Sequence, residues 1–225
     1  MKRSQVNEIL REGDAFIRSF GYVMPPFAYW SVEDMQARDT SEIAKRGMGW
    51  DITDYGQGKF DELGLFLFTT RNGLAEDLDK GRGMVYAEKI MISRDRQISP
   101  MHRHLIKSED IINRGGGTLV LELFARDGEG GIDRDAQVRV PVDGQWKTLD
   151  AGGHLKLAPG ESVTLHPDTW HAFWGEGGDV LIGEVSTVND DNTDNIFEAP
   201  IGRFATIEED VDPQHLLVSD YATYL

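Results

Sequence analysis

The N-terminal part of the chain places its apolar residues with the period of a helix. Apolar positions recur at spacings of three and four between Val6 and Phe20, and a glycine and two prolines follow this stretch. A shorter helix is predicted after Ser31, because Ser31 and Asp34 have the spacing of a capping box. Residues 1–58 are therefore expected to form a helical and irregular N-terminal extension.

From residue 59 onward the pattern changes to the two-residue alternation of β-strands. Strands are predicted at 63–71, 84–92, 118–125 and 179–188, with hairpins at 138–149, turning at Asp143-Gly144, and at 154–165, turning at Pro159-Gly160. Short strands at this regular spacing predict an all-β sandwich or barrel over residues 59–188, on which residues 189–225 pack as a tail. No repeat or linker divides the sequence, so residues 1–225 are expected to form one domain.

The net charge of the chain limits the classes of binding partner that are expected. The 225 residues include 39 acidic and 23 basic side chains, which gives a formal net charge of −16. This charge repels phosphate backbones and anionic lipid, so neither a nucleic acid nor a membrane is expected as a partner. No apolar signal-peptide core opens the sequence, which favours a cytoplasmic protein.

The absence of cysteine makes the six histidines the residues to follow. Without thiolates, any metal ion must be held by imidazole and carboxylate groups. His102 and His104 alternate in a predicted strand, so both imidazoles lie on one face and can reach a single ion. Glu109 follows at a distance that lets the chain bend and return a carboxylate to that ion. Ordinary strand histidines are the alternative interpretation.

A further ligand is expected from residues 160–174, which contain His166 and His171. His166 precedes a proline and is expected at a strand end or turn, so His171 is the favoured ligand. Three imidazoles and one carboxylate would leave coordination positions open for substrate oxygens.

The segment from His102 to Gly116 resembles the first motif of the cupin superfamily, H-x-H-x(3,4)-E-x6-G, with Glu109 as its carboxylate. Gly160, Pro167 and His171 fit the second cupin motif more loosely. Six further segments resemble D-lyxose isomerases in their order and spacing: GDAFIRSFGY (13–22), PPFAYW (25–30), HRHLIKSEDI (102–111), TWHAFW (169–174), NDDNTDN (189–195) and GRF (202–204).

This resemblance implies a cupin barrel (a double-stranded β-helix or jelly roll) that carries an N-terminal helical extension. It also implies a divalent metal, usually Mn²⁺ with Zn²⁺, Co²⁺, Ni²⁺ or Fe²⁺ as alternatives, held by three histidines and one glutamate. The implied reaction interconverts D-lyxose and D-xylulose, and also D-mannose and D-fructose, through a metal-stabilised enediolate. Lys107 falls on an active-site position of the family; from the sequence alone it would be a solvated loop lysine.

Four other residues are candidates for the sugar site. Glu184 is a polar residue in an apolar strand and a candidate base, although its side chain either enters the barrel or lies on the wet face. Trp170 is a candidate for stacking on a sugar ring, with core packing as the alternative. Glu198 and Arg203 are candidate contacts to sugar hydroxyls, with ordinary surface charge as the alternative.

Two rival functions use the same ligand set: an iron-dependent cupin dioxygenase, and a cupin that binds sugar without turning it over. The expected substrate is a small neutral monosaccharide, because no Lys or Arg cluster is visible that would hold a sugar phosphate. By analogy with other cupins, which pair through exposed sheet edges, a homodimer is expected.

Overall fold

Two long strands form the frame of the fold. The computed structural model describes residues 1–191 and 193–225, and in it β5 (Glu109–Arg126) and β11 (Trp170–Thr187) pair antiparallel. Both strands bend midway at glycines, where the register between them shifts. A Cβ atom on Gly116 would lie 2.1 Å from the carbonyl oxygen of Asp179, so a glycine is needed for this close approach. Each long strand therefore contributes its two halves to two different sheets.

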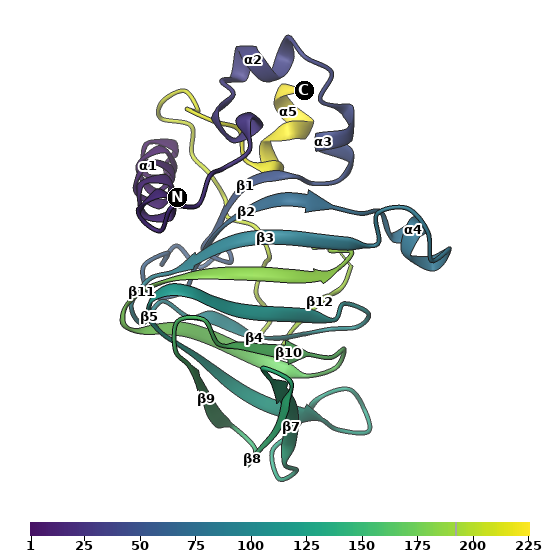
Figure 1. Ribbon diagram of the computed structural model, residues 1–225. Coiled ribbons are helices and arrows are strands. Elements are labelled where there is room, and N and C mark those ends of the chain that lie inside the picture. Colours follow the sequence, from purple (N-terminus) through teal and green to yellow (C-terminus); the bar gives the residue numbers. More distant parts are fainter. Residues whose placement is uncertain (192) are drawn as a thin grey trace.

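The paired strands form one continuous network, which the two bends divide into two sheets that lie face to face as a barrel (Figure 1). The first has the order β1-β2-β3-β11-β5-β10-β7-β8. Its shorter strands are β1 (Gly49–Thr53), β2 (Leu65–Asn72), β3 (Tyr86–Ser93), β7 (Val138–Val142), β8 (Gln145–Leu149) and β10 (Ser162–Leu165). In the second sheet the other halves of β11 and β5 pair with β4 (Ser99–His104), β6 (Ile132–Asp133) and β9 (Gly153–Leu157), and β12 (Asn195–Phe197) pairs with β4. The apolar side chains that alternate inward from both sheets form the main core.

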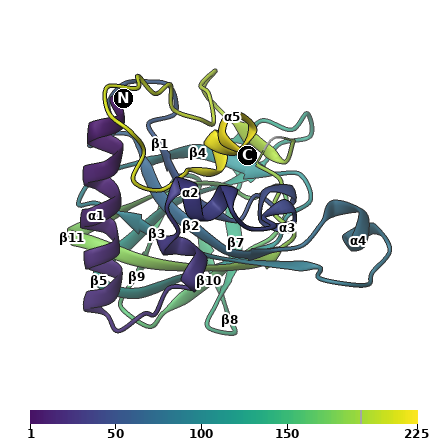
Figure 2. The same cartoon turned by 90° about the horizontal axis from the view of Figure 1, so that it is seen from above.

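Most helices cover the outer face of β1, β2 and β3 (Figures 1 and 2). Their bounds are α1 (Arg3–Ser19), η1 (Pro26–Tyr29), α2 (Val32–Gln36), α3 (Ser41–Lys45), η2 (Val218–Asp220) and α5 (Tyr221–Tyr224), and α4 (Ala75–Asp79) lies between β2 and β3. The apolar stripe of α1 packs on Phe66 and Phe68 of β2 and forms a second core outside the barrel. No helix within the described residues is long and apolar enough to cross a membrane.

The first turn of α1 holds the C-terminal tail through a buried arginine. Arg3 is 0% exposed and its guanidinium donates to Glu209 at 2.6 Å and to Asp220 at 2.8 Å. One residue further on, the Ser4 N–H and Oγ–H donate to Asp210 at 2.9 and 2.7 Å. The two ends of the sequence thus lie side by side against the barrel.

The predicted elements are largely confirmed, with two differences. The Ser31–Asp34 capping box is present, and the Asp143-Gly144 turn joins β7 to β8 with φ angles of 48° and 78°, as a two-residue hairpin turn requires. The predicted 154–165 hairpin is wrong, because β9 and β10 each pair with a different half of the bent β5. Residues 49–53 lie in the stretch expected to be helical or irregular, yet they form the fully buried strand β1.

Replacement of Arg3 by alanine is expected to lower the free energy of unfolding by about 3–5 kcal/mol, because it leaves Asp220 buried without its cation. Equilibrium unfolding in urea measures this change. The matched control is Lys156→Ala, which removes an ion pair to Glu176 whose side chains are 56% and 52% exposed, and it should cost less than about 1 kcal/mol. Equal losses in the two variants would contradict the structural role of Arg3.

Candidate metal centre and active site

Strand alternation brings three histidines together inside the barrel. His102 and His104 lie on the inward face of β4, and the register pairs His102 with His171 of β11. One ring nitrogen from each histidine lies within 4.8 Å of those of the other two. His104 and His171 are buried, at 5% and 1% exposure, and His102 is partly exposed.

Glu109, the first residue of β5, completes the cluster from the opposite sheet. Its Oε1 atom lies 3.3 Å from Nε2 of His104 and 3.2 Å from Nε2 of His171. That oxygen and both ring nitrogens of His104 are buried, and none makes a hydrogen bond among the described residues. Unsatisfied polar atoms are rare in protein interiors, and the two that face each other here, Oε1 of Glu109 and Nε2 of His104, are the expected sign of a bound ion.

Hydrogen bonds orient two of the rings toward the shared point. Nδ1 of His102 lies 2.8 Å from the carbonyl oxygen of Pro100, and Nδ1 of His171 lies 3.0 Å from that of Thr169. A carbonyl oxygen only accepts, so each Nδ1 carries the proton. This tautomer leaves the lone pair on Nε2, which is the arrangement that metal-bound histidines use.

The electrostatics hold these groups in their metal-binding forms. Burial lowers the pKa of His102 well below its usual value, and nearby His171 and His104 lower it further. Burial also lowers the pKa of His104, with a contribution from the Lys107 ammonium. For Glu109, burial acts to raise the pKa, but Lys107, His104 and His171 together outweigh burial and hold that pKa well below the usual range. Neutral imidazoles beside a carboxylate fit a borderline-to-hard divalent cation.

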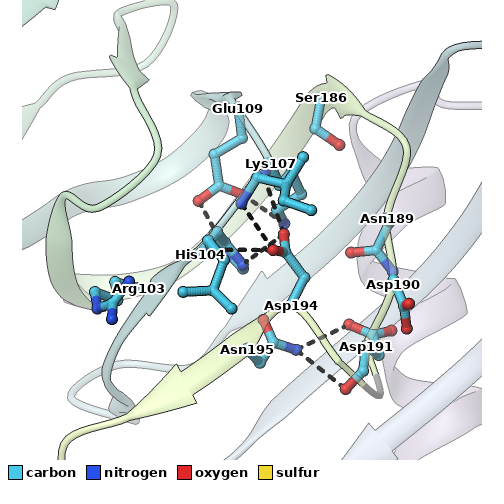
Figure 3. Close-up of polar contacts among 12 residues, drawn as sticks. Arg103, His104, Lys107, Glu109, Ser186, Asn189, Asp190, Asp191, Asp194 and Asn195 are labelled. Carbon is cyan, nitrogen blue, oxygen red and sulfur yellow. Dashed lines mark hydrogen bonds and ion pairs between the residues drawn. The ribbon is translucent and has the colours of Figure 1, made fainter. Parts of the chain in front are cut away.

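A buried lysine and a second glutamate adjoin the cluster, and Figure 3 shows the lysine beside Glu109. Lys107 is 3% exposed, and its Nζ atom lies 2.7 Å from Oε2 of Glu109 and 3.1 Å from Oε1 of Glu184. Burial acts to lower the pKa of Lys107, but the two carboxylates raise it, so the side chain stays charged. Glu184 is also 3% exposed and lines the interior, so of the two orientations left open by the sequence the inward one is found.

Further charges surround Glu184 and continue toward the tail. Lys89 of β3 faces Glu184 in the register, with Nζ 3.4 Å from its Oε1 atom. Nη2 of Arg203 lies 2.9 Å from Asp51 and 3.2 Å from Asp191. Nη1 of Arg203 is buried and has no hydrogen-bond partner among the described residues.

These groups, apart from Asp51, line one cavity inside the barrel. Apolar side chains from both sheets, among them Leu65, Phe173 and Phe197, complete its wall. The cavity thus combines a metal-binding cluster, a buried cation–carboxylate pair and apolar walls. Such an arrangement can hold a small polar molecule against an ion and move a proton on it.

Two of the candidate sugar contacts lie elsewhere. Trp170 precedes His171, so strand alternation turns it away from the cavity, where its Nε1–H donates to the carbonyl oxygen of Gly131 at 3.0 Å. Glu198 is outside the cavity lining and pairs with Arg134 at 2.6 Å on the surface. The alternative interpretations, core packing and surface charge, describe these two residues in the structure.

Sequence reasoning missed four charged residues of the site. Lys89 carried a usable signal, since it alternates with Ala87 and Met91 on the inward face of a predicted strand. Asp51 lies in the unpredicted strand β1. Asp191 and Asp194 come from the 188–195 tract, whose polar composition indicates only a loop.

The fold is similar to solved structures of L-ribose isomerases. The TM-score is 0.61 for the enzymes from Cellulomonas parahominis and Acinetobacter sp. DL28, over 92% of this chain and 98% of each of theirs. The sequence identities are 17% and 15%, so this likeness concerns the fold alone. It confirms the predicted cupin barrel with an N-terminal helix.

The sequence itself has closer relatives. The chain is 47% identical to a D-lyxose/D-mannose isomerase of Serratia proteamaculans and 44% identical to one of Escherichia coli O157:H7, and both alignments cover 100% of each chain. A profile of the D-lyxose isomerase family matches residues 1–221. The chain therefore belongs to the D-lyxose isomerase family.

Proposed function

We propose that the protein is a metal-dependent aldose–ketose isomerase that interconverts D-lyxose and D-xylulose, and D-mannose and D-fructose, with Mn²⁺ as its metal. The observation that carries this proposal is the cavity in which the three-histidine, one-glutamate cluster adjoins the buried Lys107–Glu184 pair. The names of the two relatives at 47% and 44% identity support the choice of sugars.

His102, His104, Glu109 and His171 would hold the metal. When bound, a divalent ion supplies a Lewis acid that polarises the carbonyl and hydroxyl oxygens of the sugar. The ion pair between Lys107 and Glu109 keeps that glutamate ionised and fixes its orientation toward the histidines.

Glu184 is the proposed base. Burial acts to raise its pKa, but Lys107 and Lys89 outweigh this effect and lower it, so the carboxylate is ionised and ready to accept a proton. Its contacts to Lys107, Lys89 and Ser186 all fall on Oε1, and no hydrogen bond within the described part of the chain involves Oε2. Oε2 can therefore carry a proton from one sugar carbon to its neighbour.

Lys107 and Arg203 are proposed to bind sugar oxygens. The Lys107 ammonium can donate to the oxygen on which negative charge develops as the proton leaves carbon. The Nη1–H groups of Arg203, which have no hydrogen-bond partner in the described part of the chain, can donate to a sugar hydroxyl at the other end of the cavity. Lys89, Lys107 and Arg203 each contact carboxylates within the described residues, which favours a neutral sugar over a sugar phosphate.

Isomerase assays test this function directly and separate it from its two rivals. The metal-depleted protein is supplied with Mn²⁺ and D-lyxose or D-mannose under anaerobic conditions, and ketose formation is measured. The proposal expects turnover that needs Mn²⁺ and is independent of oxygen. Turnover that requires iron and oxygen would favour a dioxygenase, and sugar binding without turnover would favour a binding protein.

Replacement of Glu184 by glutamine should lower kcat by about 100- to 10,000-fold, because the amide keeps the shape of the side chain but cannot accept the proton. Steady-state kinetics at saturating Mn²⁺ measure this loss. Glu176→Gln changes an exposed glutamate of the same strand and should leave kcat unchanged. A kcat for Glu184→Gln within twofold of the original protein would exclude Glu184 as the base.

Metal binding should also stabilise the fold. At a Mn²⁺ concentration about 100 times its Kd, the free energy of unfolding should rise by about 2.7 kcal/mol relative to the chelated protein, because the ion binds only the folded chain. His104→Ala should abolish this gain, whereas His166→Ala, an exposed histidine outside the cavity, should retain it. Urea unfolding with and without Mn²⁺ measures the difference, and an equal gain in both variants would contradict the site.

A further inference from the structure

The turn that joins His104 to Glu109 carries Lys107 but is not held by its own apolar side chains. Leu105 and Ile106 are 45% and 67% exposed, so little apolar burial fixes this turn. Its position nevertheless decides where Lys107 lies relative to both glutamates. Some other interaction must therefore hold its backbone.

That interaction comes from a single carboxylate of the C-terminal tail (Figure 3). Oδ1 of Asp194 accepts the N–H groups of Leu105 at 3.0 Å and Ile106 at 2.8 Å, and its Oδ2 accepts that of Lys107 at 3.0 Å. Three consecutive N–H groups thus point at one side chain, which is itself 5% exposed. Hydrogen bonds from N–H groups to an ionised carboxylate are about twice as strong as neutral ones.

The pairing of β12 with β4 explains why Asp194 reaches this turn. The register places Asn195 opposite His104. In an antiparallel pair, the residue before Asn195 must then lie beside the residue after His104. Asp194 is therefore delivered to the start of the turn by the pairing of a three-residue strand.

The same carboxylate also faces a candidate metal ligand. Oδ2 of Asp194 lies 3.8 Å from Nδ1 of His104. The other two histidines direct Nδ1 at backbone carbonyls, whereas Nδ1 of His104 makes no hydrogen bond among the described residues and faces this carboxylate. Its negative charge favours the tautomer with the proton on Nδ1, which leaves Nε2 free for the ion.

We propose that Asp194 is a positioning residue that orients the His104 ring and holds the Lys107 backbone in place. Metal affinity and turnover then both depend on this one carboxylate of the C-terminal tail. The effect on turnover rests on the proposed isomerase function. The effect on metal affinity and on the backbone of the turn does not depend on it.

The test compares Asp194→Asn with the original protein at a temperature where both are folded, as checked by circular dichroism. The carboxylate of Asp194 accepts three N–H groups with two oxygens, whereas an asparagine amide has only one acceptor oxygen. The Mn²⁺ Kd of the metal-depleted protein should therefore rise by about 10- to 100-fold. At saturating Mn²⁺ kcat should still fall at least tenfold, with KM for D-lyxose changed less. Asp133→Asn is the matched control, because Asp133 accepts two N–H groups of an exposed loop outside the cavity, and both quantities should stay within twofold.

Hydrogen exchange of the unmodified protein provides a second measurement that needs no variant. The amides of Leu105, Ile106 and Lys107 should exchange slowly although two of their side chains face solvent, and mass spectrometry of peptides spanning 104–108 reads this out. Fast exchange of these amides, or a Mn²⁺ Kd and kcat of Asp194→Asn within twofold of the original protein, would overturn the proposal. If the original protein turns over no sugar, the proposed function fails, while the Kd and the exchange rates still decide the role of Asp194.

Discussion

The antiparallel pairing of β5 with β11, and the glycine bend that the two strands share, is the constraint on which the site depends. In the ladder Glu109 pairs with Ser186, which is 15 residues from His171 along β11. In a straight strand, at ~3.3 Å per residue, Ser186 and His171 would be about 50 Å apart. The bend folds the ladder onto itself, so Glu109 and His171 meet at 3.2 Å across the interior. A Cβ atom at Gly116 would clash with the carbonyl oxygen of Asp179 at this bend.

The charges that this bend encloses stabilise one another. Within the described residues they include three cations and five carboxylates: Lys89, Lys107, Arg203, Asp51, Glu109, Glu184, Asp191 and Asp194. Moving an ionised side chain from water into the protein interior costs on the order of several kcal/mol, so such a group stays charged only when it contacts a group of opposite charge. Burial and Arg203 act in opposite directions on the pKa of Asp51, and burial prevails there, whereas the cations prevail at Glu184. The pairing leaves the interior polar, and each of these three cations already contacts a carboxylate of the described residues, which suits a neutral polyol.

How much the sequence predicts depends on whether a residue's neighbours are set by local periodicity. Alternation in one strand is enough to place His102 and His104 together, and it also turns Trp170 away from His171. The orientation of Glu184 could not be predicted, because polarity does not distinguish the two faces of its strand. The charged Glu184 points into the cavity, whereas the apolar Val185 on the other face is 46% exposed. Asp51, Asp191 and Asp194 could not be predicted, since they reach the site through pairings between segments far apart in the chain.

These distant segments give the N-terminal extension and the tail a part in the site. The tail contributes Asp191, Asp194 and Arg203, while its far end is held by Arg3 at the start of α1. A barrel without them would keep its histidines but lose the groups that fix the Lys107 turn and close the other end of the cavity. The similarity to the two isomerases at 44–47% identity likewise extends over the whole chain. The functional unit is therefore the barrel together with both ends of the sequence.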